Sequence, residues 1–134
     1  MNAFLLDNIL LIAIICVCVV SLAWPYVAKR RWGPEVDNRS ATELINHKNA
    51  QIVDLRAPAD FKKECIARSV NIPADRIQNE LGKLDKTRPV LLVDDDGRRS
   101  RMASPLLRGT GFKEVFILAG GLNAWRTAKL PFSR

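Results

Sequence analysis

The residues best suited to chemistry form one short polar segment between an apolar strand and a helix. The segment reads DDDGRR and consists of Asp94, Asp95, Asp96, Gly97, Arg98 and Arg99. A carboxylate in such a loop can serve as a nucleophile or as a general acid or base, and an arginine can bind an anion. Three neighbouring carboxylates, however, oppose a bound anion. We therefore expect the two arginines to pair with the aspartates across the turn.

The elements around this segment predict an α/β domain. Four short apolar runs indicate buried strands, at residues 51–55, 69–73, 89–93 and 114–118. Helices are expected at residues 58–63, 74–84, 99–108 and 121–128. Alternating strands and helices imply a parallel sheet flanked by helices on both faces, and such sheets bind ligands beyond the carboxyl ends of their strands. The DDDGRR segment follows directly after one of these ends.

The start of the domain is set by a capping motif. Ser40 is followed three residues later by Glu43, a spacing typical of a capping box, so a helix is expected to begin at Ala41. The preceding residues, 29–39, lack apolar periodicity and contain glycine and proline, as a juxtamembrane linker would. The domain itself is expected to span residues 40–134.

An apolar segment near the N-terminus predicts a transmembrane helix. Residues 9–26 carry no charge, and as a helix they would rise about 27 Å, close to the roughly 30 Å of a bilayer core. A cleaved signal peptide is disfavoured because no Lys or Arg precedes the segment. Three basic residues follow it, Lys29, Arg30 and Arg31. The positive-inside rule then predicts a single-pass protein of the cell (inner) membrane, anchored by residues 1–28, with its N-terminus outside and its domain in the cytoplasm.

Charge and cysteine content restrict the partners. All 21 Lys and Arg but only 13 of the 14 acids lie from Lys29 onward, which gives this part a net charge of +8. We expect it to favour anionic lipid headgroups or acidic protein surfaces. Nucleic acid is not expected, because the charges are dispersed without a basic stripe. Cys16 and Cys18 lie in the apolar segment, which leaves Cys65 as the one thiol of the domain and agrees with a reducing compartment.

Five motifs in order resemble the rhodanese (sulfurtransferase) domain family. They are DLRAPADF, SVNIP, LLVDDDGRRS, LLRGTGF and VFILAGGLNAW, spread over residues 40–128. The resemblance implies a three-layer α/β fold. In active members, a cysteine after the central strand carries sulfur as a persulfide, cradled by the backbone amides of its loop. Alignment on Gly97 and the residues after it places Asp94 at that position, where no persulfide can form. Glu64, Cys65 and Arg68 also depart from the family's usual residues.

These observations leave several functions open. We expect a catalytically inactive, membrane-anchored domain that acts as a protein-binding or scaffolding module, without a cofactor or a metal. One alternative is an active sulfurtransferase that uses Cys65 as its nucleophile, and another is a structural membrane protein whose domain is passive. A remote alternative is an aspartate-based phosphatase using Asp94 and Asp96, because LLVDDDG also resembles the first motif of haloacid-dehalogenase-type enzymes. Those enzymes need further acids for magnesium, and only Glu114 follows in this chain.

The loop should keep its shape even without a cysteine. If Gly97, Arg98 and the following helix retain the family's backbone, their amides should converge on the Asp94 side chain. The carboxylate would then accept charge-assisted hydrogen bonds from within the chain.

Overall fold

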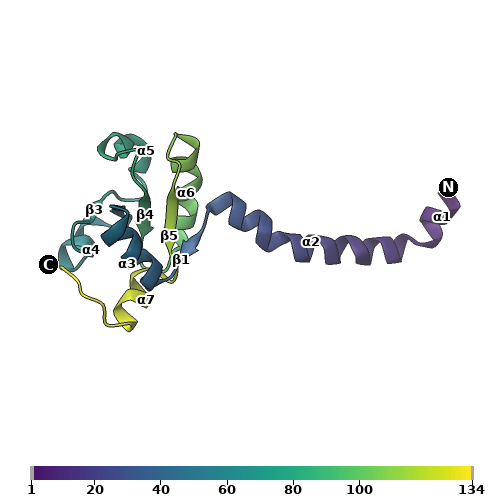
Figure 1. Ribbon diagram of the computed structural model, residues 1–134. Helices are drawn as coiled ribbons and strands as arrows, with labels where there is room; N and C mark the ends of the chain where they lie inside the picture. The colour runs from purple at the N-terminus through teal and green to yellow at the C-terminus, as the bar shows by residue number, and fades with distance from the viewer. Residues whose placement is uncertain (1, 134) are drawn as a thin grey trace. The chain divides into compact units, whose positions relative to one another are not determined.

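The N-terminal part of the chain is helical. The computed structural model describes residues 2–133 and divides the chain into two units, Met1–Arg31 and Trp32–Arg134. The first unit contains helix α1 (Asn2–Asp7) and all but the last residue of helix α2 (Ile9–Trp32) (Figure 1). Within α2, the 19 residues Ile9–Val27 are apolar and exposed. A helix of this length rises about 28 Å, which is enough to cross a membrane.

The second unit is built on a five-stranded sheet with the order β1-β5-β4-β2-β3. The strands are β1 (Glu35–Val36), β2 (Gln51–Asp54), β3 (Val70–Asn71), β4 (Val90–Val93) and β5 (Val115–Leu118). Every pairing is parallel, and β4 lies in the centre between β2 and β5. All four residues of β4 are buried, which explains why this strand is uniformly apolar. The expected parallel α/β fold is confirmed.

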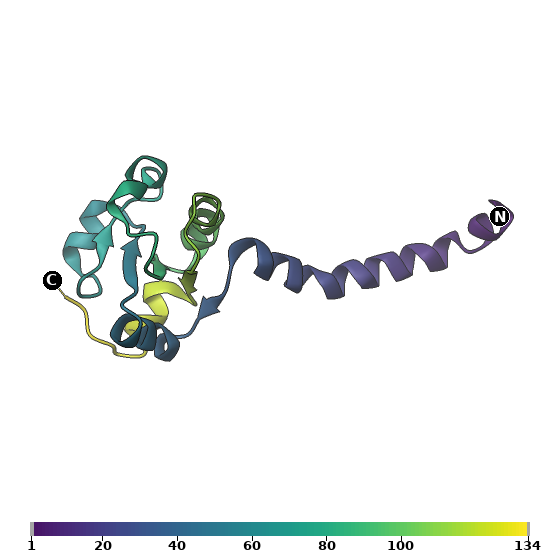
Figure 2. The same ribbon diagram turned by 45° about the horizontal axis from the view of Figure 1, so that its top comes forward.

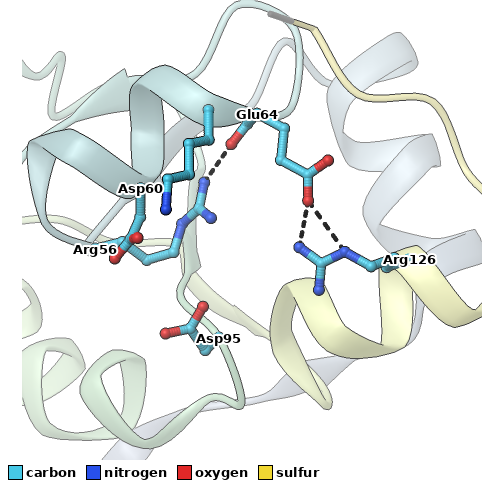
Figure 3. A pocket seen from close by; sticks show the side chains of 6 residues that line it. Arg56, Asp60, Glu64, Asp95 and Arg126 are labelled. Carbon is cyan, nitrogen blue, oxygen red and sulfur yellow. Dashed lines mark hydrogen bonds and ion pairs between the residues drawn. The ribbon is translucent and has the colours of Figure 1, made fainter.

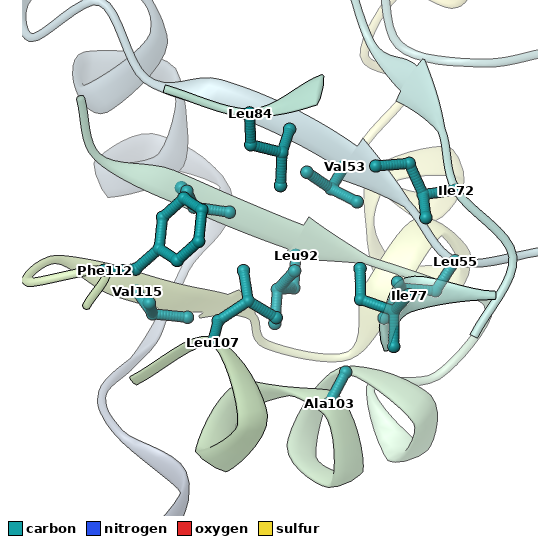
Figure 4. Packing of buried hydrophobic residues seen from close by; sticks show 11 residues of the cluster. Val53, Leu55, Ile72, Ile77, Leu84, Leu92, Ala103, Leu107, Phe112 and Val115 are labelled. Atoms are coloured by element: carbon teal, nitrogen blue, oxygen red, sulfur yellow. The ribbon is translucent and has the colours of Figure 1, made fainter. Parts of the chain in front are cut away.

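Helices cover both faces of the sheet. They are α3 (Asn38–His47), α4 (Pro58–Lys63), α5 (Ile77–Glu80), α6 (Arg98–Gly109) and α7 (Gly121–Thr127). In Figure 2, α3 and α7 lie on one side of the sheet and α5 and α6 on the other. Because successive residues of a strand point to opposite faces, Leu92 packs in one apolar cluster with Leu107 (Figure 4), whereas Leu91 packs in another with Trp125.

The segment before α3 differs from the expected linker. Residues 35–36 form β1, which pairs with β5 at one edge of the sheet, so part of the 29–39 segment belongs to the α/β unit. The helix begins at Asn38 rather than Ala41, because the Asp37 carboxylate accepts a hydrogen bond from Ser40 N at 2.8 Å and caps it. The capping box at Ser40 was therefore the wrong interpretation. The same bond holds the pKa of Asp37 below its ordinary value, so this cap stabilises the fold at neutral pH and is lost in strong acid.

The helix expected at residues 74–84 is also shorter. Only Ile77–Glu80 is α-helical, and Leu81–Lys83 continues as a 3₁₀ turn named η1. The apolar spacing was nevertheless informative, because Ile77 and Leu84 are both buried against the sheet (Figure 4). A short helix with a tight final turn buries the same side chains as a regular one would.

Candidate functional site

The loop after β4 is organised around the buried carboxylate of Asp94. This side chain is only 1 % exposed. One of its oxygens, Oδ1, accepts hydrogen bonds from Gly97 N at 2.8 Å and from the Ser100 hydroxyl at 2.8 Å. The other, Oδ2, accepts one from Arg99 N at 2.9 Å. Two backbone amides and one hydroxyl therefore converge on a single carboxylate, and the predicted convergence on Asp94 is confirmed.

The geometry of α6 explains why the carboxylate lies there. Gly97 precedes the helix with φ 98°, a left-handed conformation that glycine adopts readily. This turn points the first amides of α6 back toward the end of β4. Those amides have no acceptor within the helix and carry the positive end of its dipole. The Asp94 carboxylate satisfies them, and it occupies the place at a helix N-terminus where a bound anion would otherwise lie.

The remaining charged residues of the loop point in other directions. Arg98 pairs with Asp96, with 3.6 Å between Nε and Oδ2, so the expected pairing across the turn is confirmed for this arginine. Arg99 contacts Asp94 through its backbone N–H, not through a guanidinium ion pair as expected. Asp95 is exposed and lines a cavity. The three adjacent aspartates thus have three different surroundings.

The start of α7 holds the loop from the opposite side. Leu122 N donates to the carbonyl of Asp94 at 2.8 Å, and Asn123 N donates to that of Asp95 at 3.0 Å. A side chain at Gly121 would not fit, because its Cβ would lie 2.5 Å from both carbonyl oxygens. The backbone of the loop is therefore fixed by the amides of α6 on one side and of α7 on the other.

A buried ion pair closes the end of the neighbouring strand. Arg56 binds both carboxylate oxygens of Asp54, with Nη2 to Oδ2 at 2.8 Å and Nε to Oδ1 at 3.0 Å. Its Nη2 also donates to the carbonyl of Glu64 at 2.6 Å, which ties β2 to the end of α4. Burial disfavours the charge on Arg56, but the hydrogen bonds and charge of Asp54 outweigh it and hold the pKa of Arg56 above its ordinary value.

A cavity of about 480 Å³ lies beyond these strand ends (Figure 3). It is lined by Arg56, Asp60, Lys63, Glu64, Asp95 and Arg126. Glu64 accepts a hydrogen bond from Arg126 Nε at 3.0 Å, which joins α4 to α7 across the cavity. Three basic and three acidic side chains line this space, so it carries little net charge. It is suited to polar groups of either sign rather than to a strong anion.

Cys65 lies outside this arrangement. It is half-buried and forms an isolated antiparallel bridge with Ser133, in which Cys65 N donates to the Ser133 carbonyl at 3.0 Å. The converging amides of the α6 loop donate to Asp94 instead. The structure therefore does not bring Cys65 together with the cradle that would lower the pKa of a thiol.

Two parts of the site were not identified from the sequence. The hydroxyl of Ser100 is a ligand of Asp94, and its only signal was its position three residues after Gly97. The pair between Glu64 and Arg126 joins residues 62 positions apart, for which no local pattern exists. Asp54 and Arg56 belong to the DLRAPADF motif, but their mutual ion pair was not predicted.

The class of protein follows from comparison with known families. A sequence model of the family described as "Rhodanese-like domain" matches residues 37–128, well over half of the chain. The chain therefore belongs to the rhodanese-like domain family, and the resemblance seen in its motifs is confirmed.

Individual relatives agree with this assignment. The chain is 39 % identical over 97 residues to the "Uncharacterized protein YibN" of Escherichia coli (strain K12), covering 70 % of this chain and 68 % of that protein. It is 30 % identical over 92 residues to the "Thiosulfate sulfurtransferase GlpE" of Coxiella burnetii (strain RSA 331 / Henzerling II), covering 69 % and 86 %. The crystal structure of a rhodanese-related protein from Thermoplasma volcanium superposes with a TM-score of 0.66 at 23 % identity, over 75 % of this chain and 97 % of that one. The structural likeness shows the shared fold.

Proposed function

We propose that this chain is a catalytically inactive, membrane-anchored rhodanese-like domain that binds a protein partner at the cytoplasmic face. Asp94 stands at the position of the family's persulfide-bearing cysteine, at the end of β4 and ahead of the amides of α6. A carboxylate cannot accept sulfur to form a persulfide. It also supplies from within the chain the negative charge for which those amides are arranged.

The observation that carries this proposal is the saturation of the Asp94 carboxylate. Both of its oxygens accept hydrogen bonds from its own loop, and 1 % of the residue is exposed. An incoming thiosulfate would have to displace this carboxylate while also approaching the charges of Asp95 and Asp96. The hydrogen bonds of Asp94 therefore stabilise the conformation of the loop and leave no place for a small anionic substrate.

The two enzymatic alternatives are less well supported. A sulfurtransferase based on Cys65 lacks a stabilising environment for the thiolate, because the convergent amides bind Asp94. A phosphatase based on Asp94 needs that carboxylate directed at substrate, whereas its oxygens are engaged within the loop. Asp96 is exposed, but its Oδ1 already accepts a hydrogen bond from Arg98 N at 3.0 Å.

An assay of sulfur transfer from thiosulfate to cyanide tests the proposal that the domain is catalytically inactive. We expect the full-length protein in detergent to show no turnover above a protein-free blank, and Cys65→Ser to give the same result. In cells, the Cys65→Ser variant should complement a deletion strain as well as the wild type does, because binding of a protein partner does not need the thiol. Turnover by the wild type that disappears in Cys65→Ser would establish the sulfurtransferase alternative.

Membrane anchoring is the second component of the proposal. It rests on the apolar segment Ile9–Val27 in α2 and on the basic residues Lys29, Arg30 and Arg31 that follow it. A reporter that folds only in the cytoplasm should be active when it is fused after Arg134. The protein should also remain in the membrane fraction after alkaline washing. Activity of a reporter that requires export would reverse the proposed topology.

The nature of the partner follows from the charge of the domain. The residues from Lys29 onward carry a net charge of +8, so acidic protein surfaces and anionic lipid headgroups are the favoured contacts. The charges are dispersed over the domain, which argues against nucleic acid.

A further inference from the structure

A second cavity lies at the opposite ends of the strands, beside the first residue of β2. Its volume is about 190 Å³, and its walls include three basic side chains, Arg68, Lys83 and Arg88, with no acidic side chain. The cavity near Asp95, in contrast, is lined by equal numbers of basic and acidic residues. Basic residues from the turn before β3 and from the segment between η1 and β4 therefore line one small space.

Two of these residues have no carboxylate in direct contact within the described part of the domain, although Asp85 lies near Arg88. Hydrogen bonds from Thr87, together with the charge of Arg88, hold the pKa of Asp85 below its ordinary value. Over residues 2–133, no carboxylate forms an ion pair with Arg68 or Arg88. Arg88 is held by neutral acceptors, since its Nε donates to the Asn49 carbonyl at 3.0 Å and its Nη2 to Asn49 Oδ1 at 3.2 Å. Lys83 pairs with Glu80 at 3.3 Å. The cavity thus has one guanidinium, that of Arg88, held by neutral acceptors, and a second, that of Arg68, which forms no ion pair over residues 2–133.

Backbone conformation singles out the same place. Three residues other than glycine have positive φ in the described chain, and two of them line this cavity, Asn49 with φ 57° and Arg68 with φ 67°. Asparagine tolerates the left-handed region, but a long side chain such as arginine is disfavoured there. Strain of this kind is concentrated at functional sites, where the surrounding structure maintains it. Glycine would relieve the strain at position 68 but would remove the cation.

We propose that this cavity is a binding site for a small oxyanion, a phosphate or carboxylate group carried on a compact molecule. Guanidinium groups recognise both kinds of group through paired N–H donors. The cavity is smaller than the roughly 300–1,000 Å³ typical of drug-sized ligands, which limits the ligand to an inorganic or short organic anion. Apolar side chains also line it, Ile45, Val70 and Leu84 among them, so a short apolar group on the anion would fit. The site is separate from the Asp94 loop and does not depend on the function proposed for it.

The thermal stability of the full-length protein in a nonionic, phosphate-free detergent tests this site. Sodium phosphate and sodium butyrate are titrated against sodium chloride at equal ionic strength, with unfolding followed by intrinsic fluorescence. A ligand that binds only the folded state raises the melting temperature in a saturable way. We expect at least one of the two oxyanions to do so beyond chloride, and a lower half-saturation concentration for butyrate would identify a carboxylate with an apolar group as the preferred ligand.

Two glycine variants make the test specific. Arg68→Gly should melt no lower than the wild type in the absence of ligand, because it relieves the left-handed strain, yet its half-saturation concentration should rise at least tenfold. Lys129→Gly is the matched control, since Lys129 has φ 57° and does not line the cavity. This control should keep the wild-type half-saturation concentration. The proposal is overturned if the wild type responds to both oxyanions as it does to chloride, or if Arg68→Gly responds as Lys129→Gly does.

Discussion

Replacing Arg56 with methionine should lower the free energy of unfolding by about 3–5 kcal/mol, the usual cost of removing one partner of a buried ion pair. The side chains of Arg56 and Asp54 are 4 % and 0 % exposed, so water cannot solvate the carboxylate that remains. Methionine matches the length of the arginine stem, which limits the loss of packing. The variant also loses the bond from Nη2 to the Glu64 carbonyl, and α4 loses its connection to β2. Urea unfolding of the full-length protein, followed by circular dichroism, measures the change.

Arg98→Met is the matched control for this prediction. The Arg98 side chain is 83 % exposed and pairs with Asp96 at 3.6 Å, so its loss should cost less than about 1 kcal/mol. A double variant, Asp54→Leu with Arg56→Met, should be more stable than Arg56→Met alone, because no unpaired buried charge remains. Equal destabilisation by Arg56→Met and Arg98→Met would show that the pair between Asp54 and Arg56 contributes little to the fold.

The sequence predicted the elements whose signals are local. Strand β4 is a continuous apolar run because both of its faces are covered, and the run is short and bounded by glycine and charged residues, as a buried strand would be. The stripe of Ile77 and Leu84 correctly indicated which side chains are buried. Its helical length was overestimated, because a 3₁₀ turn at Leu81–Lys83 places the same side chains against the sheet.

Other features were decided by contacts distant in the chain. Residues 35–36 have no local sequence pattern that predicts a strand. They form β1 because they pair with the exposed edge of β5. The choice between Asp37 and Ser40 as the cap of α3 depends on this strand, which fixes the backbone just before Asp37. The pair between Glu64 and Arg126 and the hydrogen bonds from α7 to the Asp94 loop likewise join segments that no pattern connects.

The Asp94 loop was predictable for a different reason. The loop has few possible conformations, because it runs from a strand to a glycine that directly precedes a helix. The amides at the start of that helix require an acceptor, and a polar side chain in the loop can supply it. In the function proposed above, the identity of that acceptor is the property that would separate this chain from the family's enzymes. The backbone of the loop is braced by α6 and by α7, so its shape should not depend on Asp94 alone.

Asp94→Cys should therefore place a thiol in a cradle that is already formed. Gly97 N and Arg99 N, which now donate to the carboxylate, would face the sulfur and stabilise its thiolate. Thiols at helix N-termini have pKa values of roughly 3.5–7.5, compared with about 8.5 for a free cysteine. The charges of Asp95 and Asp96 act in the opposite direction, but both side chains are exposed and screened by water. We expect the pKa of the new thiol to fall clearly below 8.5.

The rate of alkylation against pH measures this pKa directly, provided that no other thiol reacts. The background is accordingly Cys16→Ala, Cys18→Ala and Cys65→Ser in the full-length protein, and the midpoint of the rate profile gives the pKa independently of the absolute rate. The control keeps Cys65 as the sole thiol, half-buried beside Ser133 and away from the amides of α6. If the thiol at position 94 titrates at or above about 8.5, the amides no longer converge once the carboxylate is gone, and Asp94 itself holds the loop in shape. A lowered pKa at position 94 alone would mean that the backbone arrangement of a sulfurtransferase persists in this chain, and that the aspartate occupies it.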